Sequence, residues 1–296
     1  MKQFDFPKLE PPAVDYPYLE RPTVVNMYDV EGTVLFPQGG GKTKYLITEY
    51  TAGAKHHNCG VFVAQPGQGS QWHTHPKETG EEEFLYILKG KGTLYYKQVR
   101  KDYEIPLKEG DGIFTGHLTH YVKNTGTEDL WILFYLAPLP VSTIIYGVRR
   151  DKGVGYVDSV NLEPPRLVHL ADPEEVRGHR GGATNKRFFT PQNTPLKYMS
   201  GFGVAIERPG TGTEWHTHPM EEEQEDLFFI AKGKGTMILL QGGKVHTFEF
   251  KEGDAILSQY LTNYTWNTGK EDLIIPVAGA PLGSKTARHK GDLLTL

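Results

Sequence analysis

The chain has 296 residues and a formal net charge of −4, with 23% charged and 38% hydrophobic residues. This mixed composition is that of a folded globular protein with room for two domains, and it lacks the basic excess of a nucleic-acid-binding protein. The one cysteine, Cys59, excludes both an internal disulfide framework and a cysteine-based zinc site.

The predicted elements are short strands. Apolar runs at residues 84–96, 129–137 and 237–243 are bounded by glycines and turn residues, as β-strands are. One weak helix candidate, DPEEVRGH at residues 172–179, begins like a capped helix but soon reaches glycine. No long stretch has helical periodicity, so the sequence predicts an all-β protein.

No apolar stretch is long enough to cross a bilayer, and residues 1–22 lack the apolar run of a secretory signal. These features predict a cytoplasmic protein without a membrane or nucleic-acid partner. The proline-rich arm of residues 1–22 could pack on a neighbouring subunit, so a homo-oligomer is left open.

One spacing recurs along the chain. The sequence KGKGT of residues 89–93 returns at 232–236, and KEGD of residues 108–111 returns at 251–254, so each copy is displaced by 143 residues (232 − 89 = 143). Self-similarity at a fixed spacing indicates a duplicated domain. The repeat predicts an arm, a first domain, a linker, a second domain and a tail, over residues 1–22, 23–150, 151–162, 163–285 and 286–296.

A histidine pair is part of this repeat, since QWHTHP at residues 71–76 returns as EWHTHP at 214–219. Residues two apart in a strand point to the same face, so His73 and His75 are expected to project together. If the strands close into a barrel, the carboxylate of Glu83 and the imidazole of a third histidine, His120, can join them inside it. Three imidazoles and one carboxylate would hold a divalent transition metal and leave about two octahedral positions open.

The spacing of these residues resembles the two motifs of the cupin superfamily. The first motif is matched by Gly67, His73, His75, Glu83 and Gly90, and the second by Gly110, His120 and Asn124. The gap of seven residues between His75 and Glu83 is longer than the motif usually has, and TGHLTH replaces its Pro-x-Gly.

Because both repeats share the pattern, the chain resembles the two-domain bicupins. This resemblance implies two tandem double-stranded β-helix barrels of the jelly-roll type. The ligand set does not choose the metal: Fe²⁺ and Mn²⁺ are favoured, and Ni²⁺, Zn²⁺ and Cu²⁺ fit as well.

The second copy has altered ligands. The equivalents at +143 are His216, His218, Asp226 and Asn263. Aspartate is shorter than glutamate, and asparagine is a poor metal ligand compared with histidine. Two histidines and a carboxylate could still form a facial triad, so a second metal is left open.

Four further side chains are candidates for the chemistry. Glu78 and Glu82 could act as general acid or base in a loop over the metal, although an acidic loop is also typical of a solvated surface. Gln71 and its counterpart Glu214 are expected to share a face with the histidine pair and to contact substrate.

These residues predict a metal-dependent enzyme whose active site is in the first barrel and whose substrate is a small oxygen-rich organic molecule. The first hypothesis is a non-haem dioxygenase-type oxidoreductase. The alternatives are a Lewis-acid lyase, decarboxylase, isomerase or aminohydrolase, or a bicupin that binds a small ligand without turnover. Among the bicupins that the chain resembles, the oxalate decarboxylases carry full ligand sets in both barrels. Asn263 departs from that pattern, because it stands where a third histidine ligand is expected.

Overall fold

The computed structural model of the chain describes residues 9–10, 22–75, 78–99, 101–141, 144–145 and 162–291. In these ranges the fold is all-β, as predicted, and the helices are α1 (Glu49–Ala52) and a 3₁₀ turn, η1 (Met220–Glu222). Two compact units form. The unit here named the first barrel comprises residues 27–173 and 195–199, and the second barrel comprises residues 1–26, 174–194 and 200–296.

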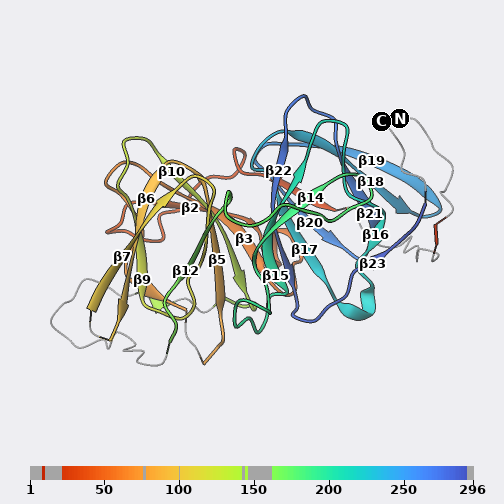
Figure 1. Cartoon of the computed structure of the whole chain (residues 1–296). Coiled ribbons are helices and arrows are strands. Elements are labelled where there is room, and N and C mark those ends of the chain that lie inside the picture. Colours follow the sequence, from red (N-terminus) through yellow and green to blue (C-terminus); the bar gives the residue numbers. More distant parts are fainter. Residues whose placement is uncertain are drawn as a thin grey trace. The chain divides into compact units, whose positions relative to one another are not determined.

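The first barrel is made of two antiparallel sheets, β12-β8-β5-β10-β3-β2 and β11-β4-β9-β6-β7 (Figure 1). Its strands are β2 (Lys42–Ile47), β3 (Asn58–Ala64), β4 (His73–Thr74), β5 (Glu82–Lys89), β6 (Lys91–Gln98), β7 (Lys101–Lys108), β8 (Asp111–Phe114), β9 (His120–Asn124), β10 (Leu130–Ala137), β11 (Ile144–Ile145) and β12 (Arg166–His169).

The second barrel repeats this topology with the sheets β1-β20-β17-β22-β15-β14-β13 and β19-β18-β21-β16-β23. Its strands are β1 (Thr23–Asn26), β13 (Val176–Arg177), β14 (Thr184–Phe189), β15 (Gly201–Glu207), β16 (His216–Thr217), β17 (Glu225–Phe229), β18 (Lys234–Gln241), β19 (Lys244–Lys251), β20 (Asp254–Gln259), β21 (Thr262–Asn267), β22 (Leu273–Ala280) and β23 (Ala287–Arg288).

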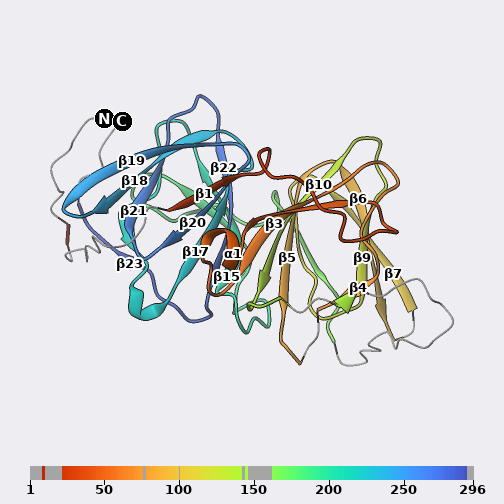
Figure 2. The same ribbon diagram turned by 180° about the vertical axis from the view of Figure 1, so that it is seen from behind.

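Two strands belong to the opposite barrel from the one that the sequence predicts. β1 pairs with β20 of the second barrel, as Figure 2 shows, whereas β12 pairs with β8 of the first barrel. The two pairings are equivalent under the repeat, because Asn26 lies opposite Asp254 and His169 lies opposite Asp111. The predicted boundaries at residues 23 and 163 are therefore wrong for these strands.

The structure corrects two smaller predictions, and two others fall almost wholly outside the described residues. The helix candidate at residues 172–179 is wrong, since β13 pairs with β14 there. The predicted tail, residues 286–296, begins with strand β23, which pairs with β16. The predicted arm and the predicted linker lie almost wholly outside the described residues.

Each KGKGT segment contains a glycine that lies just before a strand: Gly90 separates β5 from β6, and Gly233 precedes β18. Gly90 has φ +86° and its repeat Gly233 has φ +88°, a region that favours glycine. A Cβ on Gly90 would lie 2.6 Å from the carbonyl oxygen of Asp129. This position fixes the sharp connection from β5 to β6.

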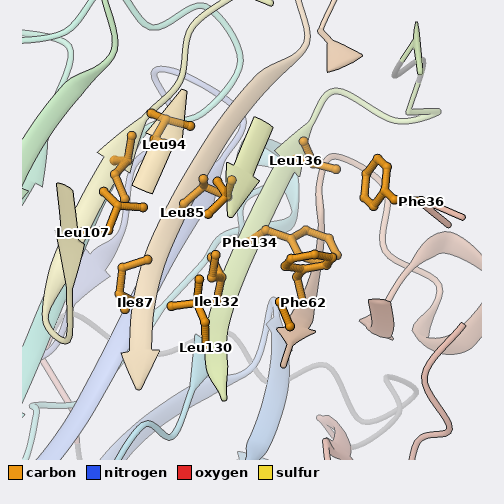
Figure 3. Packing of buried hydrophobic residues seen from close by; sticks show 13 residues of the cluster. Phe36, Phe62, Leu85, Ile87, Leu94, Leu107, Leu130, Ile132, Phe134 and Leu136 are labelled. Carbon is orange, nitrogen blue, oxygen red and sulfur yellow. The ribbon is translucent and has the colours of Figure 1, made fainter. Parts of the chain in front are cut away.

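Alternation along β5 divides one barrel interior into a metal-ligand end and an apolar end. Leu85 and Ile87 share the face of Glu83, as expected, and both are buried. They pack in one apolar cluster with Ile132 and Phe134 of β10, as Figure 3 shows. This buried apolar cluster lies next to the ligand side chains inside the barrel.

Candidate metal centre

The three histidines of the first barrel are held in one orientation. The Nδ1–H of His73 donates to the carbonyl of Gln71 and that of His120 donates to the carbonyl of Leu118, both at 2.8 Å. Because a carbonyl oxygen only accepts, these contacts fix the tautomer and leave each Nε2 with a lone pair. His75 donates from Nδ1 to the Glu81 carboxylate at 2.6 Å.

The Nε2 atoms of two of these histidines approach one carboxylate. Oε2 of Glu83 lies 3.2 Å from Nε2 of His120 and 3.4 Å from Nε2 of His75. The ring centroid of His73 lies 4.3 Å from that of His120. One ligand atom from each of the four buried residues lies within 4.8 Å of the others. The structure thus brings together all four ligands predicted for this barrel.

The cluster is electrostatically coupled. Burial, and then the charges of His120 and His75, lower the pKa of His73 to about 3, so this imidazole is neutral. Burial also disfavours charge on His75, but the Glu83 charge and the Glu81 hydrogen bond outweigh it and raise the pKa of His75 to about 10. Burial disfavours charge on Glu83 too, yet His75 and His120 hold its pKa well below the usual range.

This donor set fits a divalent transition metal. Three imidazoles and one ionised carboxylate face a common point, and neutral imidazole with carboxylate is a set that such ions prefer; an ion bound there would take the place of the Nε2 proton that the raised pKa gives His75. The hydrogen bonds at the opposite nitrogens are the outer contacts that orient histidine ligands. The residues that would hold the ion are His73, His75, Glu83 and His120.

Glu81 is a site residue that sequence reasoning missed. Its carboxylate is 1% exposed and bonds His75 rather than solvent. A carboxylate behind a ligating histidine raises the basicity of that histidine and orients its ring. The sequence offered three consecutive glutamates, and no spacing rule separates the outer contact from its neighbours.

The prediction of an acid or base role for Glu82 is wrong in this geometry. Its buried carboxylate accepts hydrogen bonds from three consecutive backbone N–H groups, those of Lys197, Tyr198 and Met199. It follows Glu81 and precedes Glu83 in an extended segment, so alternation turns it away from the cluster. Glu78 is exposed, and its role remains a prediction.

A cavity of about 350 Å³ adjoins the cluster. Its lining is mainly apolar, and the described lining residues include no lysine or arginine: Leu35, Phe36, Thr43, Tyr45, Phe62, Ser70, His73, His75, Glu83, Leu85, Val122, Ile132, Phe134, Leu136 and Val141. Gln71 is not among them, and its side-chain oxygen instead accepts the N–H of Gln38 at 3.2 Å.

Tyr45 is a second residue that the sequence did not single out. Its ring packs edge-on against Phe134, with centroids 5.6 Å apart, and it lines the cavity. Burial, followed by the charges of Glu81 and Glu83, raises its pKa, so the phenol stays protonated. It is a hydrogen-bond donor beside the metal ligands.

The second copy does not assemble the same site. Its His218 lies 3.1 Å from Asp226, and His216 donates to the carbonyl of Glu214 at 2.8 Å. Yet across the described residues, the first barrel alone brings three or more histidine, cysteine or acidic ligand atoms within 4.8 Å of one another. The described residues therefore give no support to the second metal that the sequence left open for this barrel.

The remaining predicted residues of the second barrel have other contacts. The amide nitrogen of Asn263 donates to the Leu261 carbonyl at 2.8 Å and to Ser258 at 3.2 Å. Glu214 pairs with Arg288 at 2.8 Å, and its contact with substrate remains a prediction. Asn263 therefore lacks the imidazole of His120, and hydrogen bonds to Leu261 and Ser258 hold its side-chain amide.

Comparisons with known proteins agree with the fold and the site. A family model described as "Cupin domain" matches residues 60–135, the segment that carries all four ligands. Polyketide synthase CurC of Streptomyces cyaneus is 31% identical over 121 residues, which are 40% of this chain and 71% of that protein. Protein SchB of Streptomyces halstedii is 34% identical over 101 residues, which are 34% of this chain and 68% of that protein.

Among solved structures, the oxalate decarboxylase of Lactobacillus farciminis in complex with formate has a TM-score of 0.70 and 13% sequence identity. The match covers 93% of this chain and 90% of that one. At this identity the likeness establishes the two-barrel fold alone. In the described ranges, no helix is long and apolar enough to span a membrane.

Proposed function

This chain belongs to the cupin superfamily, as a two-barrel member, and on that premise we propose that it is a metal-dependent enzyme with one active site, in the first barrel. The observation that carries the proposal is the convergence of three oriented imidazoles and one carboxylate beside a cavity that His73, His75 and Glu83 line. A site that is buried, mainly apolar and equipped with a few convergent polar groups is suited to a small molecule.

The cavity lining indicates the class of substrate. Phe36, Phe62 and Phe134 present aromatic surface to it, whereas the described lining offers no lysine or arginine to a small dianion such as oxalate. We propose a mainly apolar substrate with two neighbouring oxygens that chelate the ion. The similarity to a protein named as a polyketide synthase supports an oxygenated carbon skeleton of this kind.

The chain's own residues have distinct tasks in this proposal. Glu81 accepts the Nδ1–H of His75 and orients the ring, so that Nε2 would face the ion once its own proton is displaced. The phenol of Tyr45 donates a hydrogen bond to a substrate oxygen, and the aromatic walls exclude water. The ion, when bound, would polarise the chelated oxygens and, if redox-active, allow dioxygen chemistry.

The reaction proposed first is a dioxygenase-type oxidation, because an apolar, water-excluding cavity accepts both dioxygen and an aromatic or enolic substrate. The second candidate is a redox-neutral decarboxylation. Tyr45 favours it, since a protonated phenol beside the metal ligands can protonate the carbanion left when carbon dioxide leaves.

Two measurements separate these reactions. Protein loaded with Fe²⁺ or Mn²⁺ is offered apolar catechols, 1,3-diketones and β-keto acids, with oxalate as the polar control, while oxygen uptake and carbon dioxide release are recorded. Oxygen consumption with an apolar chelator supports the first reaction, and carbon dioxide release without oxygen consumption supports the second. Preferred turnover of oxalate would contradict the proposed substrate class.

A further inference from the structure

The second barrel contains a larger cavity than the first, of about 490 Å³. Positions that are bulky in the first cavity are small in the second: Phe62, Phe134 and Leu136 correspond at +143 to Ala205, Val277 and Gly279. Repeat divergence has therefore enlarged this interior while its metal ligands were lost. A cavity of this size holds a small organic molecule.

A carboxyl group faces this cavity where the first barrel has a methyl group. Glu207, the last residue of β15, is 0% exposed, lines the cavity and corresponds to Ala64. The hydroxyl of Thr265, which replaces Val122, donates to Oε1 of Glu207. Oε2 is buried and has no hydrogen-bond partner within the described part of the chain.

The surroundings of Glu207 are apolar. Ala205 lies two residues before it on the same face of β15, and Leu273 lies opposite it on β22. Both belong to an apolar cluster with Ile230 and Phe250. Burial raises the pKa of Glu207 to about 8, so at neutral pH Oε2 carries a proton that it can donate.

His216 lines the same cavity as an acceptor. Its Nδ1–H donates to the carbonyl of Glu214, and burial lowers its pKa to about 3, so Nε2 keeps a lone pair. The other charged or titratable side chains that line the cavity are His179, Lys186, Arg187, His218, Asp226 and Arg288.

We propose that the second barrel binds, without a metal ion, a neutral and largely apolar small molecule whose hydroxyl or carbonyl oxygen bonds to the Glu207 carboxyl group. An oxygen of this kind gives the unpartnered Oε2 an acceptor, and the apolar wall contacts the rest of the ligand. This binding site is independent of the reaction proposed for the first barrel.

A protonated amine is the main competing ligand, and the surroundings of Glu207 disfavour it. An ammonium group needs several acceptors when it is buried, and the apolar cluster beside Glu207 supplies none; the acceptors His216 and Asp226 line the cavity but do not belong to that cluster. A carboxylate ligand beside Glu207 would meet the single proton of that side chain and no cation of the apolar cluster, since the lysine and arginines that line the cavity are not members of that cluster.

The test uses four probes that share one hydrocarbon cage: 2-adamantanone, 1-adamantanol, 1-adamantanamine and 1-adamantanecarboxylate. Binding to the full-length, metal-loaded protein at pH 6.5 is measured by calorimetry and ligand-observed NMR. The variants are Glu207→Gln, which keeps a donor and an acceptor, and Glu207→Leu, which keeps the volume without either. Glu249→Gln, at an exposed position of β19, is the matched surface control.

The ketone and the alcohol are expected to bind wild-type, Glu207→Gln and Glu249→Gln proteins alike, and to bind Glu207→Leu about tenfold more weakly, the factor for one lost hydrogen bond. The affinity of the ketone for the wild type should also fall as the pH rises past 8, because ionised Glu207 cannot donate, whereas the alcohol can then donate its own hydroxyl proton to the carboxylate. Equal affinity for Glu207→Leu, stronger binding of the amine, or no binding of either neutral probe would overturn the proposal. Since no turnover is measured, an inactive first barrel would not affect these outcomes.

Discussion

The interiors of the two barrels differ far more than their strand order and turns. The strand order and the turn glycines repeat at 143 residues, and even Asn124 and Asn267 cap the same turns with the same three contacts. Inside, a cluster of potential metal ligands beside an apolar cavity contrasts with a larger cavity that the buried carboxyl group of Glu207 lines. Interior positions can diverge in this way because the backbone hydrogen bonds of the sheets do not depend on them.

The difference is concentrated at few positions of the metal centre. Glu81, Glu83 and His120 become Gln224, Asp226 and Asn263, while both histidine pairs remain. The loss of two ligands and of one outer carboxylate is sufficient to remove the cluster. A histidine pair alone therefore does not identify a metal site in this fold.

The largest expected effect is that of His75→Ala, which removes one of three imidazoles from the first barrel. We expect elemental analysis to show loss of about one bound metal per chain, since a buried N/O site needs its full set to outweigh desolvation. The matched variant His218→Ala, at the repeat position, should leave the metal content unchanged. Equal losses from both variants would contradict the one-site interpretation.

The reverse experiment rebuilds the missing set. The triple variant Gln224→Glu, Asp226→Glu and Asn263→His should raise the content towards two metals per chain. A histidine at 263 can donate from Nδ1 to the Leu261 carbonyl, which now accepts from the asparagine amide at 2.8 Å, as His120 donates to Leu118. The double variant that keeps Asn263 is the control and should gain little. An unchanged metal content in the triple variant would show that the backbones of the two barrels differ more than their strand registers indicate.

The carboxyl group of the second cavity should make stability depend on pH. The pKa of Glu207 is raised from 4.5 to about 8, so the folded state holds a proton that the unfolded state releases. The associated stability is fully present below pH 4.5 and is lost as the pH rises towards 8, at about 1.4 kcal/mol per pH unit.

Glu207→Gln should therefore be more stable than the wild type at pH 8, by several kcal/mol at most, with the difference shrinking towards pH 4.5. Urea unfolding across this range measures it. Glu249→Gln should follow the wild type, because that side chain is exposed. A constant offset between Glu207→Gln and the wild type at every pH would contradict the raised pKa.

The smallest of these effects is expected at Glu81. Glu81→Gln gives the first barrel the residue that the second has at Gln224, and it should lower metal affinity about 10- to 100-fold, as loss of an outer contact does. Competition with a chelator measures this change. Gln224→Glu alone should not create a second site, and an unchanged affinity in Glu81→Gln would reduce Glu81 to a packing role.

Sequence reasoning found the four ligands because strand alternation and motif spacing are local properties. It missed Glu81 and assigned chemistry to Glu82, since in EEE the side chain that faces a histidine depends on where the strand begins. Glu207 carried a signal that went unused. It is an acid in an otherwise apolar strand, and its repeat partner is Ala64.

The strand exchange could not be deduced from the repeat. β1 and β12 occupy equivalent registers, and either could complete either sheet by local criteria. The chain connection and long-range packing determine which sheet each strand joins, and no sequence motif encodes either of them.

By itself, the sequence determined the duplication, the all-β class and the identity of the first ligand set, because periodicity and spacing along one chain encode which side chains share a face. Only the tertiary structure decided which glutamate supports His75, which sheet each exchanged strand completes, and that the second barrel encloses Glu207 with an unpartnered oxygen. Those outcomes depend on atoms distant in sequence that meet only when the barrels close.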